Sequence, residues 1–285
     1  MEIKSLNGID FDIVFDAFAQ AFADYEIQQS KISLQAMLKR RGFNADLSFA
    51  AFEGNKIVAF TLNGIGKFNG INTAYDTGTG TLKEYRGKGL ATKIFEYSLP
   101  YLKKAGIEQY LLEVLQYNTK AISVYKNLGF EVTREFDYFI LSNQDYKSNM
   151  KVSDFNCSIK QVNLEDLNFV SEFWDFNPSW QNSFESIKRS KADFVILSAY
   201  IDTEIVGYCV FEPISGDVTQ IAVDKENRRK GVATALLNEA IKLNKKDKFK
   251  FVNIETTCHS FIGFLEAQNN YVKGAQYEMI KLINS

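Results

Sequence analysis

The pattern of apolar and polar positions divides the chain into two halves with the same order of elements. In the first half, apolar residues recur at helical spacing over 13–23, and two strands at 47–52 and 57–62 enclose a hairpin turn at Glu53-Gly54-Asn55. The pattern then predicts, in order, a strand at 75–82, a helix at 89–104, a strand at 110–115, a helix at 119–128 and strands within 130–141. This alternation is typical of a mixed α/β unit.

Three residues mark the ends or breaks of these helices. Pro100 falls inside the helix predicted at 89–104 and should kink it or make it restart. Asn118 is suited to cap the start of the helix at 119–128, and Gly129 is suited to end it.

The second half repeats the order with shorter connections. Its predicted elements are a helix at 166–175, a strand hairpin at 194–200 and 205–211, a strand at 218–223, a helix at 232–243 and a strand at 251–256. The polar stretch between the halves lacks clear periodicity. We therefore expect an N-terminal domain at 1–142, a linker at 143–156 and a C-terminal domain at 157–285.

One short motif occurs once in each half, between a predicted strand and a predicted helix. It reads RGKGLA at 86–91 and RRKGVA at 228–233. A helix N-terminus presents unpaired backbone N–H groups and partial positive charge, and glycines let the backbone curl around phosphate oxygens. The motif therefore predicts a diphosphate cradle, although a solvated basic turn would have the same composition.

Composition narrows the classes of function. A net charge of −2 and a pI near 5.7 give no general attraction to nucleic acid or to an anionic membrane. The N-terminus lacks the order of a signal peptide and no run of eighteen apolar residues occurs, so we expect a cytoplasmic protein. Three cysteines and one histidine, His259, without metal-ligand spacing predict neither a disulfide framework nor a metal site.

The motif and the segment after it resemble the GNAT superfamily of acyl-CoA-dependent N-acetyltransferases. The resemblance rests on Arg86, Gly89 and Ala91, and then on NTKAISVYKNLGF, which begins at Asn118. It implies two GNAT-like domains, each with a mostly antiparallel sheet flanked by helices and a splayed parallel pair of strands at the cofactor site. A dinucleotide-binding fold fits less well, because GxGxxG spacing is absent.

The resemblance also implies where acetyl-CoA binds. The cradle takes the diphosphate, while Asn118 and the strand before the cradle contact the pantetheine arm. The cofactor-binding residues implied in this way are Thr81, Arg86, Gly87, Lys88, Gly89, Leu90, Ala91 and Asn118 in the first half, and Val223, Arg228, Arg229, Lys230, Gly231, Val232 and Ala233 in the second.

Catalytic roles follow from the same resemblance. Tyr125 stands where the family places the acid that protonates the departing CoA thiolate, although a helical tyrosine can simply pack on the core. Glu113 is a candidate base or water-orienting group, or a strand residue that faces solvent or an arginine. In the second half, Glu255 takes the place of Glu113, and no tyrosine stands near the place of Tyr125, which falls on Leu265, Glu266 or Ala267.

The acceptor is less well defined. Asp24, Tyr25 and Glu26 follow the first helix and could receive a cationic amine, or form a solvated acidic surface. We expect an N-acetyltransferase that acts on a small-molecule or peptide amine, with the N-terminal domain as the catalyst and with neither a nucleic-acid nor a membrane partner. The alternatives are a CoA-binding sensor or scaffold without turnover, and an acyltransferase for longer acyl-CoA.

Overall fold

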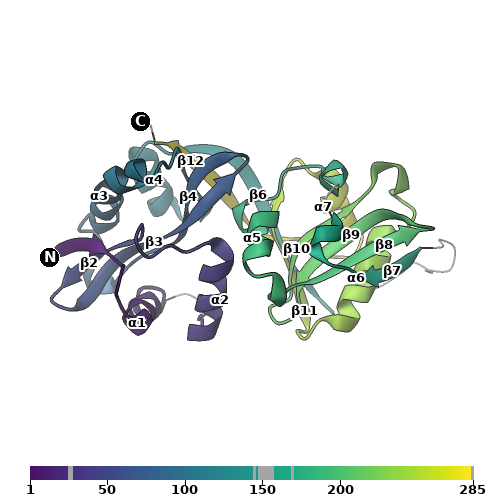
Figure 1. Ribbon diagram of the computed structural model, residues 1–285, viewed down its shortest axis with the longest axis horizontal. Coiled ribbons are helices and arrows are strands. Elements are labelled where there is room, and N and C mark those ends of the chain that lie inside the picture. Colours follow the sequence, from purple (N-terminus) through teal and green to yellow (C-terminus); the bar gives the residue numbers. More distant parts are fainter. Residues whose placement is uncertain (25–27, 144–145, 147–156, 168–169, 284–285) are drawn as a thin grey trace. The chain divides into compact units, whose positions relative to one another are not determined.

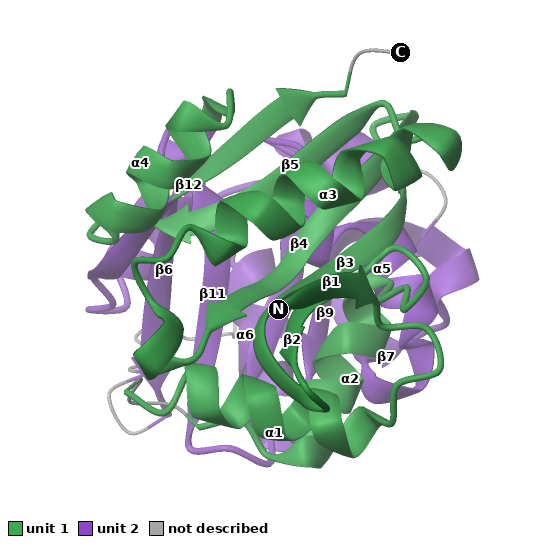
Figure 2. Ribbon diagram, turned by 90° about the vertical axis from the view of Figure 1, so that its left-hand side faces the viewer, with its two compact units in different colours: residues 1–133, 277–285 green, residues 134–276 purple. Residues whose placement is uncertain are grey.

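The structure is a computed structural model, and it describes residues 1–24, 28–143, 146, 157–167 and 170–283. The chain forms two compact units, which Figure 2 distinguishes by colour: Met1–Thr133 with Tyr277–Ser285, and Arg134–Gln276. The linker expected at 143–156 lies outside the described residues, except for Asn143 and Tyr146. Within the described part, no helix has both the length and the apolar character needed to cross a membrane.

The N-terminal unit is built on a mixed sheet. Its strands follow the spatial order β1 (Glu2–Ser5), β2 (Phe49–Glu53), β3 (Lys56–Phe68), β4 (Ile71–Thr81), β5 (Gln109–Leu115) and the end of β12 (Val272–Leu282). The first four strands pair antiparallel, and β3 and β4 form the long hairpin seen in Figure 1. β4 and β5 pair in parallel. The mixed sheet confirms the predicted fold class.

Helices cover both faces of this sheet. α1 (Phe11–Ala21) and α2 (Lys31–Arg41) pack on the face that carries Ala50, Phe60 and Leu62. α3 (Leu90–Lys104) packs on the opposite face, over Phe49 and Val58, and α4 (Thr119–Asn127) joins the core beside β5. The predicted helices α1, α3 and α4 are thus confirmed, whereas the pattern missed α2, which buries only Leu34, Leu38 and Arg40.

Pro100 does not interrupt α3. It lies on the exposed side of the helix, where water can satisfy the carbonyl that loses its N–H partner. Asn118 caps α4 as predicted, with its side chain accepting from the Ala121 N–H. Gly129 follows the helix with a φ of 84°, in the left-handed region that favours glycine.

The C-terminal unit repeats the plan. Its strands follow the spatial order β6 (Glu131–Ser142), β11 (Lys248–Glu255), β10 (Asp217–Val223), β9 (Glu204–Glu212), β8 (Val195–Ile201) and β7 (Ser158–Gln161). β10 and β11 form its parallel pair. Its α-helices are α5 (Phe184–Arg189), α6 (Val232–Leu243) and α7 (His259–Glu266).

Among the described residues of 166–175, the predicted helix is not formed. Asp166 and Leu167 belong to the 3₁₀ turn η3 (Leu164–Leu167), and the 3₁₀ turn η4 (Val170–Phe173) follows, with Trp174 and Asp175 beyond it. The buried residues Leu164, Leu167, Val170 and Phe173 recur every three positions, which matches the three-residue turn of a 3₁₀ helix better than the 3.6-residue turn of an α-helix.

Each unit receives a strand from the other half of the sequence. β6 continues the N-terminal half, yet its Phe139 and Leu141 pair with Phe251 and Phe249 of β11. β12 ends in the N-terminal unit, where Met279 and Ile283 join the core. The compact units therefore differ from the expected boundaries: residues 134–142 belong to the C-terminal unit and 277–285 to the N-terminal unit.

Candidate active site and cofactor cradles

Both cradles have the backbone geometry of an open helix N-terminus. Gly89 and Gly231 are the N-caps of α3 and α6, with φ values of 69° and 89°, and neither helix has a side-chain cap. Gly87 is also left-handed, with a φ of 77°. A Cβ atom added at Gly87 or Gly89 would meet no heavy atom within 4 Å. The first amides of α3 are therefore approachable, which fits the diphosphate of acetyl-CoA.

The first arginine of the motif is engaged within the protein. Arg86 donates from Nε to the Thr81 carbonyl at 3.2 Å and from Nη2 to the Ala21 carbonyl at 2.9 Å. Its Nη1 donates to Asp24 at 3.0 Å. Arg86 thus ties the end of α1 to the junction of β4 and α3.

Asp24 consequently lies beside the cradle. The hydrogen bond from Arg86 and the charge of Lys83, 3.8 Å away, hold the pKa of the Asp24 carboxyl below its ordinary value. The other two residues of the predicted acceptor group, Tyr25 and Glu26, lie outside the described residues.

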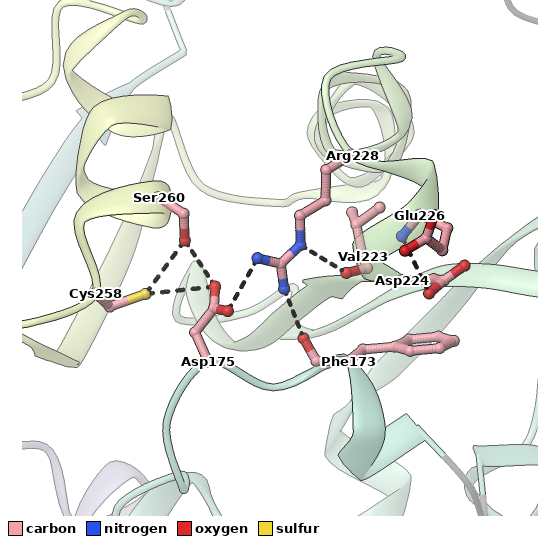
Figure 3. Close-up of polar contacts among 8 residues, drawn as sticks. All are labelled: Phe173, Asp175, Val223, Asp224, Glu226, Arg228, Cys258 and Ser260. Carbon is pink, nitrogen blue, oxygen red and sulfur yellow. Dashed lines mark hydrogen bonds and ion pairs between the residues drawn. The ribbon is translucent and has the colours of Figure 1, made fainter.

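The C-terminal unit builds the same arrangement around Arg228 (Figure 3). This guanidinium donates to the carbonyls of Val223 at 3.2 Å and Phe173 at 3.0 Å, and to Asp175 at 2.9 Å. Asp175 also accepts from Ser260 at 2.6 Å, so it links the cradle to the start of α7. Asp175 could not be found by matching the two halves of the sequence. The aspartate lies 62 residues before the arginine in the first half (Asp24 and Arg86) and 53 residues before it in the second (Asp175 and Arg228), so no constant spacing marks it.

The pKa of Asp175 reflects opposing effects. Burial by itself raises it, but hydrogen bonds from Ser260 and Arg228, together with the charges of Arg228 and Lys225, bring it below its ordinary value. Cys258, at 3.8 Å from Asp175, is a buried thiol whose pKa is raised, chiefly by burial. The carboxylate is therefore the charged partner of Arg228.

The parallel strands of each unit separate soon after they pair. β4 and β5 are in register only at Thr73–Tyr75 with Gln109–Leu111. β10 and β11 are in register only at Asp217–Val218 with Lys250–Phe251. Just beyond, each of these strands has a bulge in its pairing with its antiparallel neighbour, at Thr77 in β4 against β3 and at Thr219 in β10 against β9. The predicted splayed pair is confirmed in both units.

Tyr125 reaches the splay of the N-terminal unit. Its hydroxyl donates to Asp76 at 3.3 Å, and its ring packs against Phe130 at 5.6 Å between centroids. Tyr125 and Asp76 line a small cavity of about 10 Å³, and Ala91 of the cradle helix lines it as well. The structure therefore brings together the predicted acid and the end of the cradle.

Asp76 is a residue that sequence reasoning did not single out. Burial raises the pKa of its carboxyl to about 6, against hydrogen bonds from Thr79, Gly78 and Tyr125 that lower it. The signal available in the sequence was a lone carboxylate in the otherwise uncharged strand INTAYDTGTGT. A partly buried carboxylate with a pKa near neutrality is typical of a functional site.

Glu113 lies on β5, two residues beyond the last paired position. Its carboxylate accepts a hydrogen bond from the Tyr75 hydroxyl on β4, so the two side chains bridge the splay. Burial and the charge of Glu113 raise the pKa of Tyr75 well above its ordinary value. Tyr75 therefore stays a neutral donor that orients the partly exposed Glu113.

Backbone hydrogen bonds define the equivalent positions in the C-terminal unit. The N-cap of α7 is Cys258, in the place of Asn118, and seven residues later the place of Tyr125 is taken by Leu265. The Asn118 N–H donates to the Leu115 carbonyl and the Cys258 N–H to the Glu255 carbonyl, both at 2.9 Å. Glu255 therefore corresponds to Leu115, and the predicted equivalence of Glu255 with Glu113 is wrong.

Two further positions follow from the same alignment. Asn253, which has a φ of 62°, stands in the place of Glu113. Asp76 comes directly before the bulge at Thr77 in β4, and Val218 comes directly before the bulge at Thr219 in β10. Val218 therefore stands in the place of Asp76. The hydrogen-bonded pair of Asp76 and Tyr125 is thus replaced in the C-terminal unit by the buried apolar pair Val218 and Leu265.

The C-terminal unit instead has a large cavity, of about 420 Å³. It extends from the cradle, including Arg229 and Gly231, along the separated strands to α7. Its walls are mainly apolar. Among the residues that line it are Phe173, Trp174, Phe176, Val218, Phe251 and Phe261.

Comparisons with known proteins agree with this architecture. The model of the acetyltransferase (GNAT) family matches residues 12–130 and 162–268, one match in each half. A tandem GNAT protein from the clavulanic acid biosynthesis pathway superposes with a TM-score of 0.75 at 10% identity, over 100% of this chain and 99% of that one. The GCN5-related N-acetyltransferase of Sphaerobacter thermophilus superposes with a TM-score of 0.73 at 13% identity, over 100% and 96%.

Two curated relatives share part of the sequence. N-alpha-acetyltransferase 30 of Schizosaccharomyces pombe is 40% identical over 60 residues, 21% of this chain and 40% of that protein. N-alpha-acetyltransferase MAK3 of Arabidopsis thaliana is 26% identical over 99 residues, 35% of this chain and 52% of that protein. The matched part spans about half or less of either relative. Because the family model matches most of the chain, once in each half, this protein belongs to the GNAT acetyltransferase family.

Proposed function

We propose that the protein transfers an acetyl group from acetyl-CoA to an amine, and that the N-terminal unit performs the reaction. The observation that carries the proposal is the hydrogen bond from Tyr125 to Asp76 at the splay of β4 and β5. The C-terminal unit has Val218 and Leu265 at these positions and so lacks both groups.

The residues of the N-terminal unit supply the parts that acetyl transfer requires. Acetyl-CoA, when bound, supplies an activated thioester. The open amides after Gly89, with Lys88 beside them, suit its diphosphate, and the separated strands β4 and β5 suit its arm. These groups orient the reaction and exclude water, which lowers the barrier by positioning.

Proton transfer falls to two pairs of side chains. The Tyr125 hydroxyl is the donor for the departing thiolate, and Asp76 holds that hydroxyl in place. Since its pKa is about 6, Asp76 exchanges protons near neutral pH and can restore one to Tyr125. On the opposite face of the sheet, Tyr75 orients Glu113, which can accept a proton from the attacking amine.

The acceptor is an amine on a small molecule or a peptide. Two relatives of this chain are N-alpha-acetyltransferases, which supports a primary amine as the nucleophile. The partly exposed carboxylate of Glu113 would favour an ammonium group at the entrance.

Substitution of Tyr125 by Phe tests the proposal. It keeps the ring and removes the hydroxyl, so kcat should fall by roughly 10²-fold while the affinity for acetyl-CoA stays the same. Tyr117→Phe is the matched control, because Tyr117 lies just before α4 and is 75% exposed. Unchanged kcat in Tyr125→Phe, when chemistry limits the rate, would remove Tyr125 from the mechanism.

A sensor or scaffold that binds CoA without turnover is the second candidate. The loss of both the carboxylate and the phenol from the C-terminal unit favours it for that half of the chain. If the wild type binds acetyl-CoA but releases no CoA with any of a broad panel of amines, the sensor function replaces the enzymatic one.

A further inference from the structure

Three polar side chains gather at the splay, on the face of the N-terminal sheet that α1 and α2 cover. Arg41 is the last residue of α2, and its carbonyl oxygen lies against the position that a Cβ atom at Gly64 would take. Gly64 pairs with Tyr75 across β3 and β4, so the two residues share this face. Tyr75 in turn donates to Glu113 on β5. Glycine at position 64 thus lets the end of α2 approach the sheet beside Tyr75 and Glu113.

The guanidinium of Arg41 reaches from α2 to the separated part of β4. Its Nη1 donates to the Thr77 carbonyl at 3.3 Å, beyond the last residue of β4 that pairs with β5. Its Cζ lies 6.0 Å from the centre of the Tyr75 ring. Burial and the charge of Glu113 raise the pKa of Tyr75, and the charge of Arg41 opposes this rise. Arg41 and Glu113 therefore act on one phenol with opposite charges.

The two charged side chains, rather than the phenol, face a ligand. Tyr75 is 1% exposed, whereas Arg41 and Glu113 are both partly exposed. The Tyr75 hydroxyl holds the carboxylate of Glu113, and its ring lies beside the guanidinium of Arg41. A molecule with an ammonium group and a carboxylate matches this arrangement, because each of its charges would meet the opposite charge.

The C-terminal unit engages the corresponding charges within the protein. Asp217 stands in the place of Tyr75, two residues before the bulge, and forms an ion pair with Lys250 at 3.0 Å. α5 precedes the hairpin of β8 and β9 as α2 precedes that of β2 and β3, and it ends at Arg189. The Cζ of Arg189 lies 5.2 Å from the centre of the buried Trp180 ring. The arrangement around the phenol is therefore not a consequence of the shared fold.

We propose that the amine acceptor of the N-terminal unit also carries a carboxylate, and that Arg41 is the residue that selects it. The ammonium group of the acceptor lies at Glu113, and its carboxylate lies at the guanidinium of Arg41, whose planar fork suits a carboxylate. The inference rests on the proposed function, because it names the class of amine that the same site acetylates.

Matched pairs of acceptors test the selection in the full chain. Glycine, β-alanine and γ-aminobutyrate carry an amine and a carboxylate at increasing separation, and each is compared with its own primary amide. The ratio of kcat/KM for the acid to kcat/KM for the amide is measured by CoA release. For the preferred acid, this ratio should be at least about tenfold lower in Arg41→Gln than in the wild type. Differences in amine basicity cancel, because both enzymes receive the same two substrates.

Two further variants separate recognition of the acceptor from support of the fold. Lys39→Gln removes a positive charge from an exposed position of the same helix and should leave the ratio unchanged. Arg41→Lys keeps a positive charge without the planar fork and should recover part of the ratio. If Arg41 only held β4 through the Thr77 carbonyl, Arg41→Gln would lower kcat/KM for acid and amide alike. An unchanged ratio in Arg41→Gln would therefore overturn the inference.

Calorimetric titration of the complex with CoA gives a readout that needs no turnover. The wild type should bind at least one acid of the series about tenfold more tightly than its amide, and Arg41→Gln should lose this preference. If the wild type prefers no acid over its amide, the inference is overturned, even where Arg41→Gln does not fold. A preference in binding without CoA release from acetyl-CoA and any acceptor would instead refute the proposed function and leave the ligand class in place.

Discussion

Asp175 accepts a hydrogen bond from Arg228 at 2.9 Å, and Asp24 accepts one from Arg86 at 3.0 Å in the other unit. Each of these arginines also donates to the carbonyl at the end of the strand before its cradle, Arg228 to Val223 and Arg86 to Thr81. The first arginine of the repeated motif therefore holds the fold together around the cradle. Its charge is already paired before any ligand binds.

Asp175→Asn should destabilise the C-terminal unit. The carboxylate is 30% exposed and bonds Arg228 and Ser260, so its replacement should cost about 1 kcal/mol at pH 7. Because the folded pKa lies below the ordinary value of 3.8, this stability is present above that value and is lost as the pH falls through the folded pKa. Denaturant titrations at pH 7 and pH 3 measure the difference.

Asp24→Asn is the control for this prediction. Asp24 is 51% exposed, so its ion pair is better screened and the loss should be smaller. An equal loss in Asp175→Asn at both pH values would show that its charge is not responsible.

Asp76→Asn should stabilise the N-terminal unit at neutral pH. The folded pKa of about 6 lies above the ordinary 3.8, so the contribution of Asp76 to stability is greatest below pH 3.8 and is lost as the pH rises through 6. The amide of asparagine does not ionise, so Asp76→Asn avoids this loss of folding free energy, which has an upper limit of about 3 kcal/mol. Thermal melts from pH 4 to pH 8 should show a gain that grows with pH; a gain independent of pH would contradict the assignment.

Gly89→Glu should abolish the stabilisation of the N-terminal unit by acetyl-CoA. The φ of 69° already favours glycine, and the added carboxylate meets open space where the diphosphate is expected. Gly89→Ala separates strain from charge and should retain most of the ligand-induced rise in Tm. If both variants respond to acetyl-CoA like the wild type, the cradle lies elsewhere.

Met279→Ala should destabilise the N-terminal unit even though it lies near the end of the sequence. Met279 on β12 is fully buried in the core with Phe95 and Tyr110, so truncation should cost about 2–4 kcal/mol. Leu282→Ala on the same strand is the control, because Leu282 is 65% exposed and should change little. Thermal melts of both variants measure the change, with the transition of the N-terminal unit identified as the one that acetyl-CoA shifts.

The same strand exchange predicts the behaviour of fragments. A chain cut after Ser142 leaves the N-terminal fragment without Met279 and Ile283, so we expect fragment 1–142 to lack the cooperative transition of that unit. Adding a peptide of residues 272–285 in trans should restore it. A cooperative melt of fragment 1–142 alone would show that β12 is dispensable.

Local sequence determined the elements that carry strong periodic signals. α6 begins and ends where the pattern predicts, at Val232 and Leu243, and the repeated glycines placed both cradles at helix N-termini. These features depend on neighbours a few residues apart, such as the spacing of apolar side chains and the backbone freedom of glycine. The predicted acid Tyr125 lies at the splay because the cap at Asn118 fixes the phase of its helix.

Tertiary structure decided what depends on distant partners. An alternating strand pattern does not specify which sheet the strand joins, so the exchange of β6 and β12 could not be predicted from it. Asp76 became a candidate catalytic residue only when the fold buried its carboxyl, which raises its pKa, and set it beside Tyr125. Asp175 became one only when the fold set it beside Arg228. Burial, charge pairing and strand partnership arise between segments far apart in sequence, and only folding brings those segments together.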